Sequence, residues 1–187
     1  MDRRQRKTRN AIFTAFISLL SEKNYNRITV GDIIERADIG RATFYAHFET
    51  KDFLLKELCD ELFCHIFDCI TGEGEKHSHI FTCYAPDSIF LHLFQHIQNN
   101  DNRLLSLLSC SNNELFLSYF KNGLINIVRN QGLATEKATK ENLSEDFIIN
   151  HIASTFVETT RWWIENKMSL SPEEITGYFL AVTNINQ

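Results

Sequence analysis

Residues 28–56 read ITVGDIIERADIGRATFYAHFETKDFLLK and decide the fold of the chain. Thr29 is a good N-cap for a short helix, since its hydroxyl can accept a hydrogen bond from a free amide of the first turn. Asp32 follows three residues on, as in a capping box. Apolar residues then recur at helical spacing up to Asp38, which tolerates a left-handed backbone, and Gly40 suits the start of another helix. The stretch predicts two helices joined by a break of about four residues, which is a helix-turn-helix.

The second helix of this pair is predicted from Arg41 to Phe48, and its residue types divide between two faces. Phe44 and Phe48 are spaced to point inward. The residues that remain reachable are polar or small: Arg41, Thr43, His47, Ala42 and Ala46. Small residues allow a helix to approach base edges in a major groove, and such helices read bases with residues near their N-terminus, where Arg41 stands. The pattern therefore indicates contact with double-stranded DNA.

The distribution of charge supports a DNA-binding head, although the formal net charge of the chain is −5. Residues 1–56 carry 11 Lys and Arg against 7 Asp and Glu, whereas the rest of the chain carries 8 against 17. Because attraction to phosphate is screened beyond about 8 Å at physiological salt, the local sign matters more than the total. Five basic residues open the first predicted helix and are candidates for phosphate or minor-groove contact, with a solvated, frayed end as the alternative. They are Arg3, Arg4, Arg6, Lys7 and Arg9.

Residues 8–56 resemble the DNA-binding domain of the tetracycline repressor (TetR) family of one-component regulators. The matching positions agree in residue type and in spacing: Thr29, Ala37, Ile39, Arg41, Ala42, Thr43, Phe44, Tyr45, His47, Phe48 and Lys51. Two positions depart from the family pattern, with Asp38 in place of glycine and Gly40 in place of a capping serine or threonine. Both residues suit the backbone conformations required there, so the departures bear on the target sequence and not on the motif.

The resemblance implies a set of DNA-contacting residues: Thr29, Gly40, Arg41, Ala42, Thr43, Tyr45, His47 and Lys51. Arg41 and Thr43 are expected to read bases. The residues expected to hold phosphates are Thr29, Tyr45, His47 and Lys51. Lys51 stands at the N-terminus of the next helix, where a phosphate would accept bonds from the side chain and from free backbone amides. The alternative for Lys51 is a solvated lysine.

The whole chain is predicted to be all-α, with a three-helix DNA-binding domain over residues 1–50 and a helical domain for effector binding and dimerisation over residues 51–187. Only 2 prolines and 7 glycines occur among 187 residues, and apolar residues recur three and four positions apart. A helix capped by Thr50 is expected to link the two domains, and a loop is expected after it over residues 71–79. Later helices are predicted over residues 86–99, 113–130, 144–164 and 171–182, with a polar connecting loop over 133–143.

Residues 161–175 resemble the C-terminal region of a TetR-family branch found largely in Firmicutes. In the family the last two helices pair with their mates across a two-fold axis as a four-helix bundle, which implies a homodimer. The candidate interface residues are Ile149, Ile152, Phe156, Trp163, Ile175 and Phe179. Closure of the subunit's own core would use the same stripes. Two-fold DNA half-sites, which need two reading heads, favour the dimer.

Two further patterns in the C-terminal part concern ligands. The resemblance implies a small-molecule effector, and an apolar pocket for it is expected among Phe90, Phe94, Phe116, Phe120 and Phe156, with a packed aromatic core as the alternative. A soft divalent metal would suit a second set, His77, His79, Cys83, His92 and His96, of which the last two are four residues apart on a helix. No tight ligand motif occurs in that set, so neither a metal nor a cofactor is predicted.

The sequence is thus expected to encode a ligand-responsive, homodimeric transcriptional regulator, most often a repressor in this family, that binds a palindromic operator. No Gly-rich phosphate loop, nucleophile elbow or paired-acid signature occurs, which argues against an enzyme. No apolar run of about 18 residues occurs and the five cysteines form no Cys-x-x-Cys pair, so no membrane span and a reducing cytoplasmic setting are expected. Two alternatives stay open: a co-regulator that acts through protein partners, and a metal or redox sensor that uses the histidines and cysteines.

Overall fold

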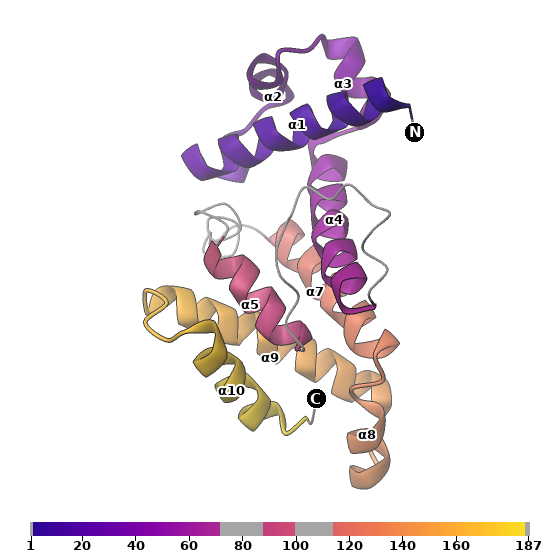
Figure 1. The fold of residues 1–187 in the computed structure, drawn as a ribbon, viewed down its shortest axis with the longest axis vertical. Helices are drawn as coiled ribbons and strands as arrows, with labels where there is room; N and C mark the ends of the chain where they lie inside the picture. Colours follow the sequence, from indigo (N-terminus) through magenta and orange to yellow (C-terminus); the bar gives the residue numbers. More distant parts are fainter. Residues whose placement is uncertain (1, 72–87, 100–113, 186–187) are drawn as a thin grey trace.

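The computed structural model describes residues 2–71, 88–99 and 114–185, with residues 65–71 and 99 described by their backbone alone. Every regular element within these ranges is helical, which confirms the all-α prediction (Figure 1). In chain order the elements are α1 (Arg3–Glu22), η1 (Tyr25–Arg27), α2 (Val30–Ala37), α3 (Arg41–His47), α4 (Lys51–Thr71), α5 (Ile89–Asn99), α7 (Glu114–Asn130), α8 (Thr135–Glu141), α9 (Glu145–Glu165) and α10 (Pro172–Thr183). None of these helices is long and apolar enough to cross a membrane.

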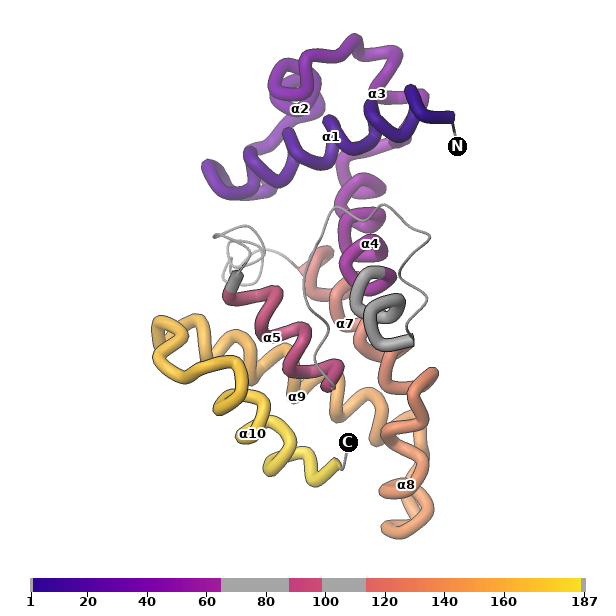
Figure 2. Tube along the Cα trace, viewed as in Figure 1, coloured from indigo at the N-terminus to yellow at the C-terminus, as the bar shows by residue number. Residues whose placement is uncertain are grey.

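Three helices form a head at one end of the molecule, and α4 runs from this head into the remaining helices (Figure 1). The head consists of α1, α2 and α3, with α2 packed against both of the others. Beyond the head, α4 lies along α7, α7 packs on α9, and α10 packs on both α5 and α9. The chain begins in the head and reaches its other end beyond α10, far from the head (Figure 2).

The head closes around one face of α1. Ile12, Phe13 and Phe16 are fully buried on this face. Phe13 meets Phe48 edge to face with ring centroids 5.4 Å apart, and Phe16 meets Tyr25 in the same way at 6.3 Å. Aromatic pairs favour such edge-to-face geometry because the positive ring edge meets the negative ring face. The two pairs join α1 to the end of α3 and to the connection that precedes α2.

The helices α4 and α7 approach each other closely at Gly123. A Cβ atom added to Gly123 would lie 2.1 Å from the ring of Phe63, which is far closer than real Cβ contacts come. Phe63 is only 7% exposed and packs against Phe120 with a centroid separation of 5.3 Å. Because glycine has no Cβ, α7 presents bare backbone to the Phe63 ring at this point. Gly123 therefore sets how closely α4 lies against the C-terminal helices.

The prediction of a polar loop over residues 133–143 was wrong, because the helix α8 forms there. Ala134 and Ala138 are buried, and α8 packs on α9. Asn142 ends the helix with a left-handed backbone (φ 51°), and its N–H donates to carbonyls of the last turn. Two alanines make too small an apolar stripe to stand out in the sequence. A helix of 7 residues is also too short to persist alone, so its contact with α9 stabilises it.

The other predicted helices are confirmed, with small changes at their ends. The helix predicted over residues 86–99 is described from Ser88, whose hydroxyl accepts from the first turn of α5. Ser144 stands at the N-cap of α9 but makes no side-chain capping bond there. Ser171 caps α10 by accepting from the Glu174 N–H at 3.2 Å. The loop predicted after α4 lies outside the described residues.

Replacement of Gly123 by alanine is expected to destabilise the protein by about 1–3 kcal/mol, because the added methyl group must displace the enclosed ring of Phe63. Equilibrium unfolding in urea measures the loss. Gly31→Ala is the matched control, since a Cβ at this exposed position in α2 would come no closer than 3.4 Å to a neighbour. The control is expected to be neutral or to stabilise by up to about 1 kcal/mol. Equal stability of the two variants would contradict the tight packing of Phe63 on Gly123.

Candidate nucleic-acid interface

The connection between α2 and α3 has the geometry predicted from residues 28–56. The Thr29 hydroxyl accepts from the Asp32 N–H at 3.1 Å, and the Asp32 carboxylate accepts from the Thr29 N–H at 2.7 Å, which completes the capping box. Asp38 ends α2 with a left-handed backbone (φ 52°, ψ 51°). Gly40 is the extended N-cap of α3, and its carbonyl accepts from the Phe44 N–H at 3.1 Å. The predicted helix-turn-helix is therefore present.

The short helix α3 buries one side and presents the other to solvent. Phe44 and Phe48 have no exposed surface, whereas the neighbouring Tyr45 is 49% exposed and meets Phe44 edge to face. The predicted DNA-contacting residues that are exposed are Thr29, Gly40, Arg41, Ala42 and Tyr45, and those that are half-buried are Thr43, His47 and Lys51. The exposed face of α3 thus combines a cation, small residues and an aromatic hydroxyl.

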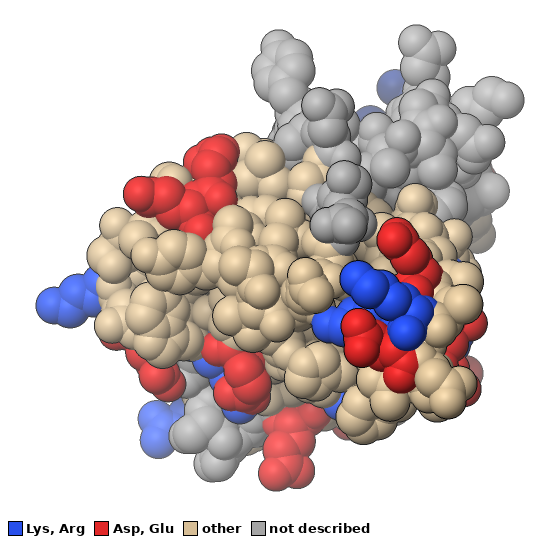
Figure 3. Space-filling model, turned by 90° about the horizontal axis from the view of Figure 1, so that it is seen from below, with Lys and Arg blue, Asp and Glu red and all other residues tan. Residues whose placement is uncertain are grey.

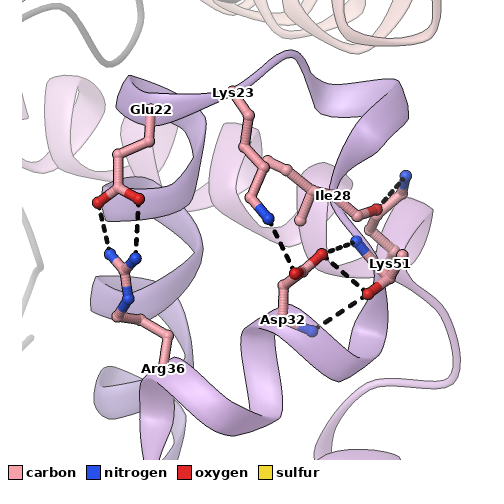
Figure 4. A network of polar contacts seen from close by, with 7 residues as sticks. Glu22, Lys23, Ile28, Asp32, Arg36 and Lys51 are labelled. Carbon is pink, nitrogen blue, oxygen red and sulfur yellow. Dashed lines mark hydrogen bonds and ion pairs between the residues drawn. The ribbon is translucent and has the colours of Figure 1, made fainter.

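Two ion pairs fix α2 against the end of α1 (Figure 4). Lys23 donates to Asp32 at 2.8 Å, and Arg36 donates to both carboxylate oxygens of Glu22 at 2.6 and 2.8 Å. The hydrogen bond from Lys23, followed by the bond from the Thr29 N–H, holds the pKa of Asp32 well below its usual range. The hydrogen bond from Arg36 likewise lowers the pKa of Glu22. Spacing within one helix does not reveal these pairs, because each joins two elements.

Lys51 lies in a more enclosed setting than the sequence predicted. Its ammonium group donates to the carbonyls of Tyr25 at 3.0 Å and Ile28 at 2.9 Å, and it lies 4.1 Å from the centroid of the Tyr25 ring. The Tyr25 hydroxyl donates to Asp52, the next residue of α4. Burial lowers the pKa of Lys51, and burial together with the bond to Asp52 raises the pKa of Tyr25. Tyr25 was not among the predicted site residues.

The basic residues at the start of α1 divide into two groups. Arg3, Arg4, Arg6 and Lys7 are exposed. Arg9 is half-buried over the rings of Phe13 and Phe48, with its guanidinium carbon 4.9 and 5.2 Å from their centroids, and it pairs with Glu57 of α4 at 2.6 Å. Arg9 therefore joins α1 to α4. The exposed basic residues are left facing solvent at the start of the helix.

Comparison with known proteins decides the family. Residues 12–58 match the family model of bacterial regulatory proteins of the tetR family, and residues 85–184 match a transcriptional regulator C-terminal region. The crystal structure of a TetR transcriptional regulator from Streptococcus agalactiae is 34% identical, covers 97% of this chain and 96% of that chain, and superposes with a TM-score of 0.70. The chain belongs to the TetR family. TetR-family proteins are transcriptional regulators that bind DNA and are not enzymes, as the sequence predicted.

Two curated TetR-type relatives match mainly at the N-terminal end. The HTH-type transcriptional regulator YxbF of Bacillus subtilis is 40% identical over 72 residues, which make up 38% of this chain and 19% of that protein. IcaR of Staphylococcus epidermidis, a negative transcriptional regulator of the biofilm operon icaADBC, is 26% identical over 91 residues, or 49% of this chain and 46% of IcaR. The matched part of this chain spans less than half the length of either relative.

The residues predicted to form the TetR-type dimer interface lie inside the subunit. Their exposed fractions are between 0 and 2%: Ile149, Ile152, Phe156, Trp163, Ile175 and Phe179. Phe156 and Phe179, for example, pack against each other with centroids 5.4 Å apart. These six side chains therefore close the subunit's own core, which was the alternative weighed from the sequence. A second subunit that packs on α9 and α10 would therefore meet their outward faces.

The five phenylalanines expected around an effector pocket form a connected aromatic cluster. All are between 0 and 1% exposed: Phe90, Phe94, Phe116, Phe120 and Phe156. Phe156 is the centre of the cluster, with ring centroids 4.5 Å from Phe94, 5.7 Å from Phe90 and 6.3 Å from Phe120. A surface pocket lies in another part of the described chain, between α8 and the end of α10. Its lining is largely charged and polar: Glu136, Lys137, Lys140, Glu141 and Asn184. An effector pocket among the five rings stays a prediction.

Only part of the candidate metal-ligand set, His77, His79, Cys83, His92 and His96, lies in the described residues. His92 and His96 are buried on α5, with ring centroids 4.9 Å apart. His77, His79 and Cys83 lie outside the described residues. Within the described ranges, no three His, Cys, Asp or Glu side chains come together as a metal site would require.

Replacement of Asp32 by asparagine is expected to remove part of the protein's acid sensitivity. Because the folded-state pKa of Asp32 is depressed, its stabilising contribution is present above the pKa of the unfolded chain and is lost as the pH falls. The free energy of unfolding of Asp32→Asn should therefore lie below wild type at neutral pH, with a gap that narrows between about pH 5 and pH 2. Urea unfolding over a pH series measures this gap.

Asp38→Asn is the matched control, since asparagine also tolerates the left-handed backbone at the end of α2. It makes the same change of charge six residues further along the same helix-turn-helix. A gap for Asp32→Asn that stays constant with pH would contradict the role of its ionised carboxylate.

Proposed function

We propose that this protein is a cytoplasmic, homodimeric transcriptional repressor that binds a palindromic operator and releases it when a small-molecule effector binds. The observation that carries the proposal is that α3 has one buried and one exposed side. Phe44 and the following Phe48 are fully buried, while Arg41 and Tyr45 stay exposed. A surface helix with a cation at its N-terminal end is suited to a major groove. Repression is supported by the likeness of the N-terminal half to IcaR, which is named as a negative regulator.

The exposed residues of the head suggest a division between base reading and phosphate binding. Arg41 and Thr43 lie in the first turn of α3, where an arginine can donate two hydrogen bonds to a guanine. Thr29, Tyr45 and His47 are proposed to hold phosphates on either side, and Gly40 and Ala42 let the backbone come close. The exposed basic residues at the start of α1 add a sequence-independent attraction: Arg3, Arg4, Arg6 and Lys7.

The proposed dimer surface consists of the outward faces of α9 and α10. Four large apolar side chains are exposed there: Phe147 (59%), Trp162 (47%), Tyr178 (57%) and Val182 (71%). Tyr178 and Val182 are one helical turn apart and share a face of α10. In the view from below, uncharged residues cover the middle of the visible face, with charged groups around it and a cluster of both signs on its right side (Figure 3). Such a face is depleted of charge in the way that interface centres are.

The effector is proposed to bind among the C-terminal helices, next to the aromatic cluster. Its rings come from α5, α7 and α9, so a ligand that separates them would move several helices at once. Phe120 also contacts Phe63 of α4, with centroids 5.3 Å apart, and α4 leads directly to the head. An effector of this kind can release DNA only to the extent that it binds the released conformation more tightly than the DNA-bound one.

Arg41→Ala tests the role of α3. We expect binding to the specific site to weaken by about 1–3 kcal/mol, while binding to random DNA changes little, because Arg41 is proposed to contact bases. Fluorescence anisotropy measures both, with a specific probe selected from random DNA by the wild-type protein. The selected sequences should be palindromic. Arg129→Ala, which removes an exposed arginine from α7, is the matched control and should leave both affinities unchanged. Equal losses on specific and random DNA would refute base reading by Arg41.

Tyr178→Glu combined with Val182→Glu tests the dimer surface. Glutamate is a good helix former at exposed positions, so the subunit should still fold. Two charges placed in an apolar interface should raise the dimer dissociation constant at least about 100-fold, which corresponds to about 3 kcal/mol. Sedimentation equilibrium measures the constant. Phe53→Glu places a charge on an exposed apolar residue of α4 and serves as the control. A double variant that dimerises as tightly as wild type would place the interface elsewhere.

A further inference from the structure

We infer that Lys51 is a positioning residue whose ammonium group clasps the two ends of the helix-turn-helix together in the protein without DNA. The clasp consists of Tyr25, Ile28, Lys51 and Asp52. The expected change in operator affinity rests on the proposed DNA binding. The contacts that Lys51 makes within the protein do not depend on that proposal.

The contacts of the Lys51 ammonium group are the first step of the argument. It has three N–H donors, and two of them are directed at the carbonyls of Tyr25 and Ile28, at 3.0 and 2.9 Å. It also lies 4.1 Å from the centroid of the Tyr25 ring, in the geometry of a cation–π contact. A phosphate would have to compete with these partners for the ammonium group. In the protein without DNA, the two carbonyls and the ring therefore take the place of water around the ammonium group.

The position of these partners along the chain is the second step. Ile28 directly precedes Thr29, the N-cap of α2, and Lys51 is the first residue of α4. The helix-turn-helix is the segment between these two residues. The hydrogen bond from Lys51 to the Ile28 carbonyl joins the two ends of this segment (Figure 4). Because both ends of this segment are held together, α2 and α3 can turn only a little relative to α4.

The packing around Tyr25 is the third step. Tyr25 is 6% exposed, its ring meets Phe16 of α1, and its hydroxyl donates to Asp52 in the first turn of α4. Its carbonyl also accepts from the Ile28 N–H at 3.1 Å. Tyr25 thus connects α1, the start of α2 and the start of α4. Lys51 binds this residue by its carbonyl and by its ring, so removal of the ammonium group loosens all three connections.

Lys51→Met tests the inference, because methionine keeps the apolar stem and removes the donors. In the DNA-free protein, amide hydrogen exchange over residues 24–33 should become about 10- to 100-fold faster, as loss of hydrogen bonds from a charged donor implies. Operator affinity should also fall. A lysine that only binds phosphate would lower the slope of the logarithm of affinity against the logarithm of salt concentration by about 0.9 and leave hydrogen exchange unchanged. That outcome would overturn the clasp.

Two further variants control for the loss of a lysine and for the loss of positive charge. Lys56→Met makes the same chemical change on the same helix, at a side chain that is 45% exposed, and should alter neither exchange nor affinity. Lys51→Arg keeps the positive charge but replaces a compact ammonium by a wide planar group, which cannot occupy the same place between two carbonyls and a ring. The clasp predicts that arginine fails to restore slow exchange and affinity. Full rescue by arginine would overturn the inference.

A measurement on the wild-type protein covers the case in which the variants do not fold. With lysines labelled by nitrogen-15, the ammonium signal of Lys51 should be protected from solvent exchange without DNA, in contrast to that of the exposed Lys7. Equal exchange at the two lysines would refute the clasp. The exchange measurements do not involve DNA, so failure of the proposed DNA binding is seen separately in the titrations.

Discussion

The head depends on the burial of two phenylalanines, Phe44 in a helix that could not persist alone and Phe48 directly after it. The helix α3 has 7 residues, and isolated helices shorter than about 12–15 residues are marginal in water. Phe44 and Phe48 are fully buried, and the ring of Phe48 meets Phe13 of α1 at 5.4 Å. Complete burial of such side chains contributes about 1.5–3 kcal/mol each, which is enough to hold the helix. The same burial sets the rotation of α3 about its axis. Stability of the head and exposure of Arg41 on its surface therefore have one physical cause.

The helix α4 carries this constraint to the rest of the molecule, because it is attached both to the head and to the C-terminal helices. At the head, Glu57 of α4 accepts from Arg9 of α1 at 2.6 Å. Further along, Phe63 lies against the bare backbone of Gly123 and against the ring of Phe120. From Phe120 the ring contacts continue through Phe156 into α5 and α10. Packed interiors have little free space, so a displaced ring moves its neighbours. The packed contacts thus form a continuous route from the aromatic cluster through α4 to the head.

Local chemistry explains which parts of this structure could be predicted from the sequence. The cap at Thr29, the left-handed turn at Asp38 and the start of α3 at Gly40 depend on residues a few positions apart, and each was predicted correctly. Lys51 was predicted to face a phosphate, but its partners are the carbonyls of Tyr25 and Ile28, more than 20 residues earlier in the chain. Sequence spacing contains no information on such a contact. The helix α8 was missed for the same reason, since its packing on α9 stabilises it.

The dimer residues illustrate a further limit, which arises from periodicity itself. An apolar stripe predicts that one face of a helix is covered, but it does not say whether the cover is the same chain or a second one. The helix α9 buries Ile149, Ile152 and Phe156 within the subunit and leaves Phe147 and Trp162 exposed. Phe147 and Trp162 are 15 residues apart and so lie within about 60° of each other around the helix. A helix that is apolar on two faces needs two partners. The stronger stripe of α9 is used within the subunit. The exposed aromatic residues are therefore the part of α9 that remains for the proposed second subunit, together with the aligned apolar residues of α10.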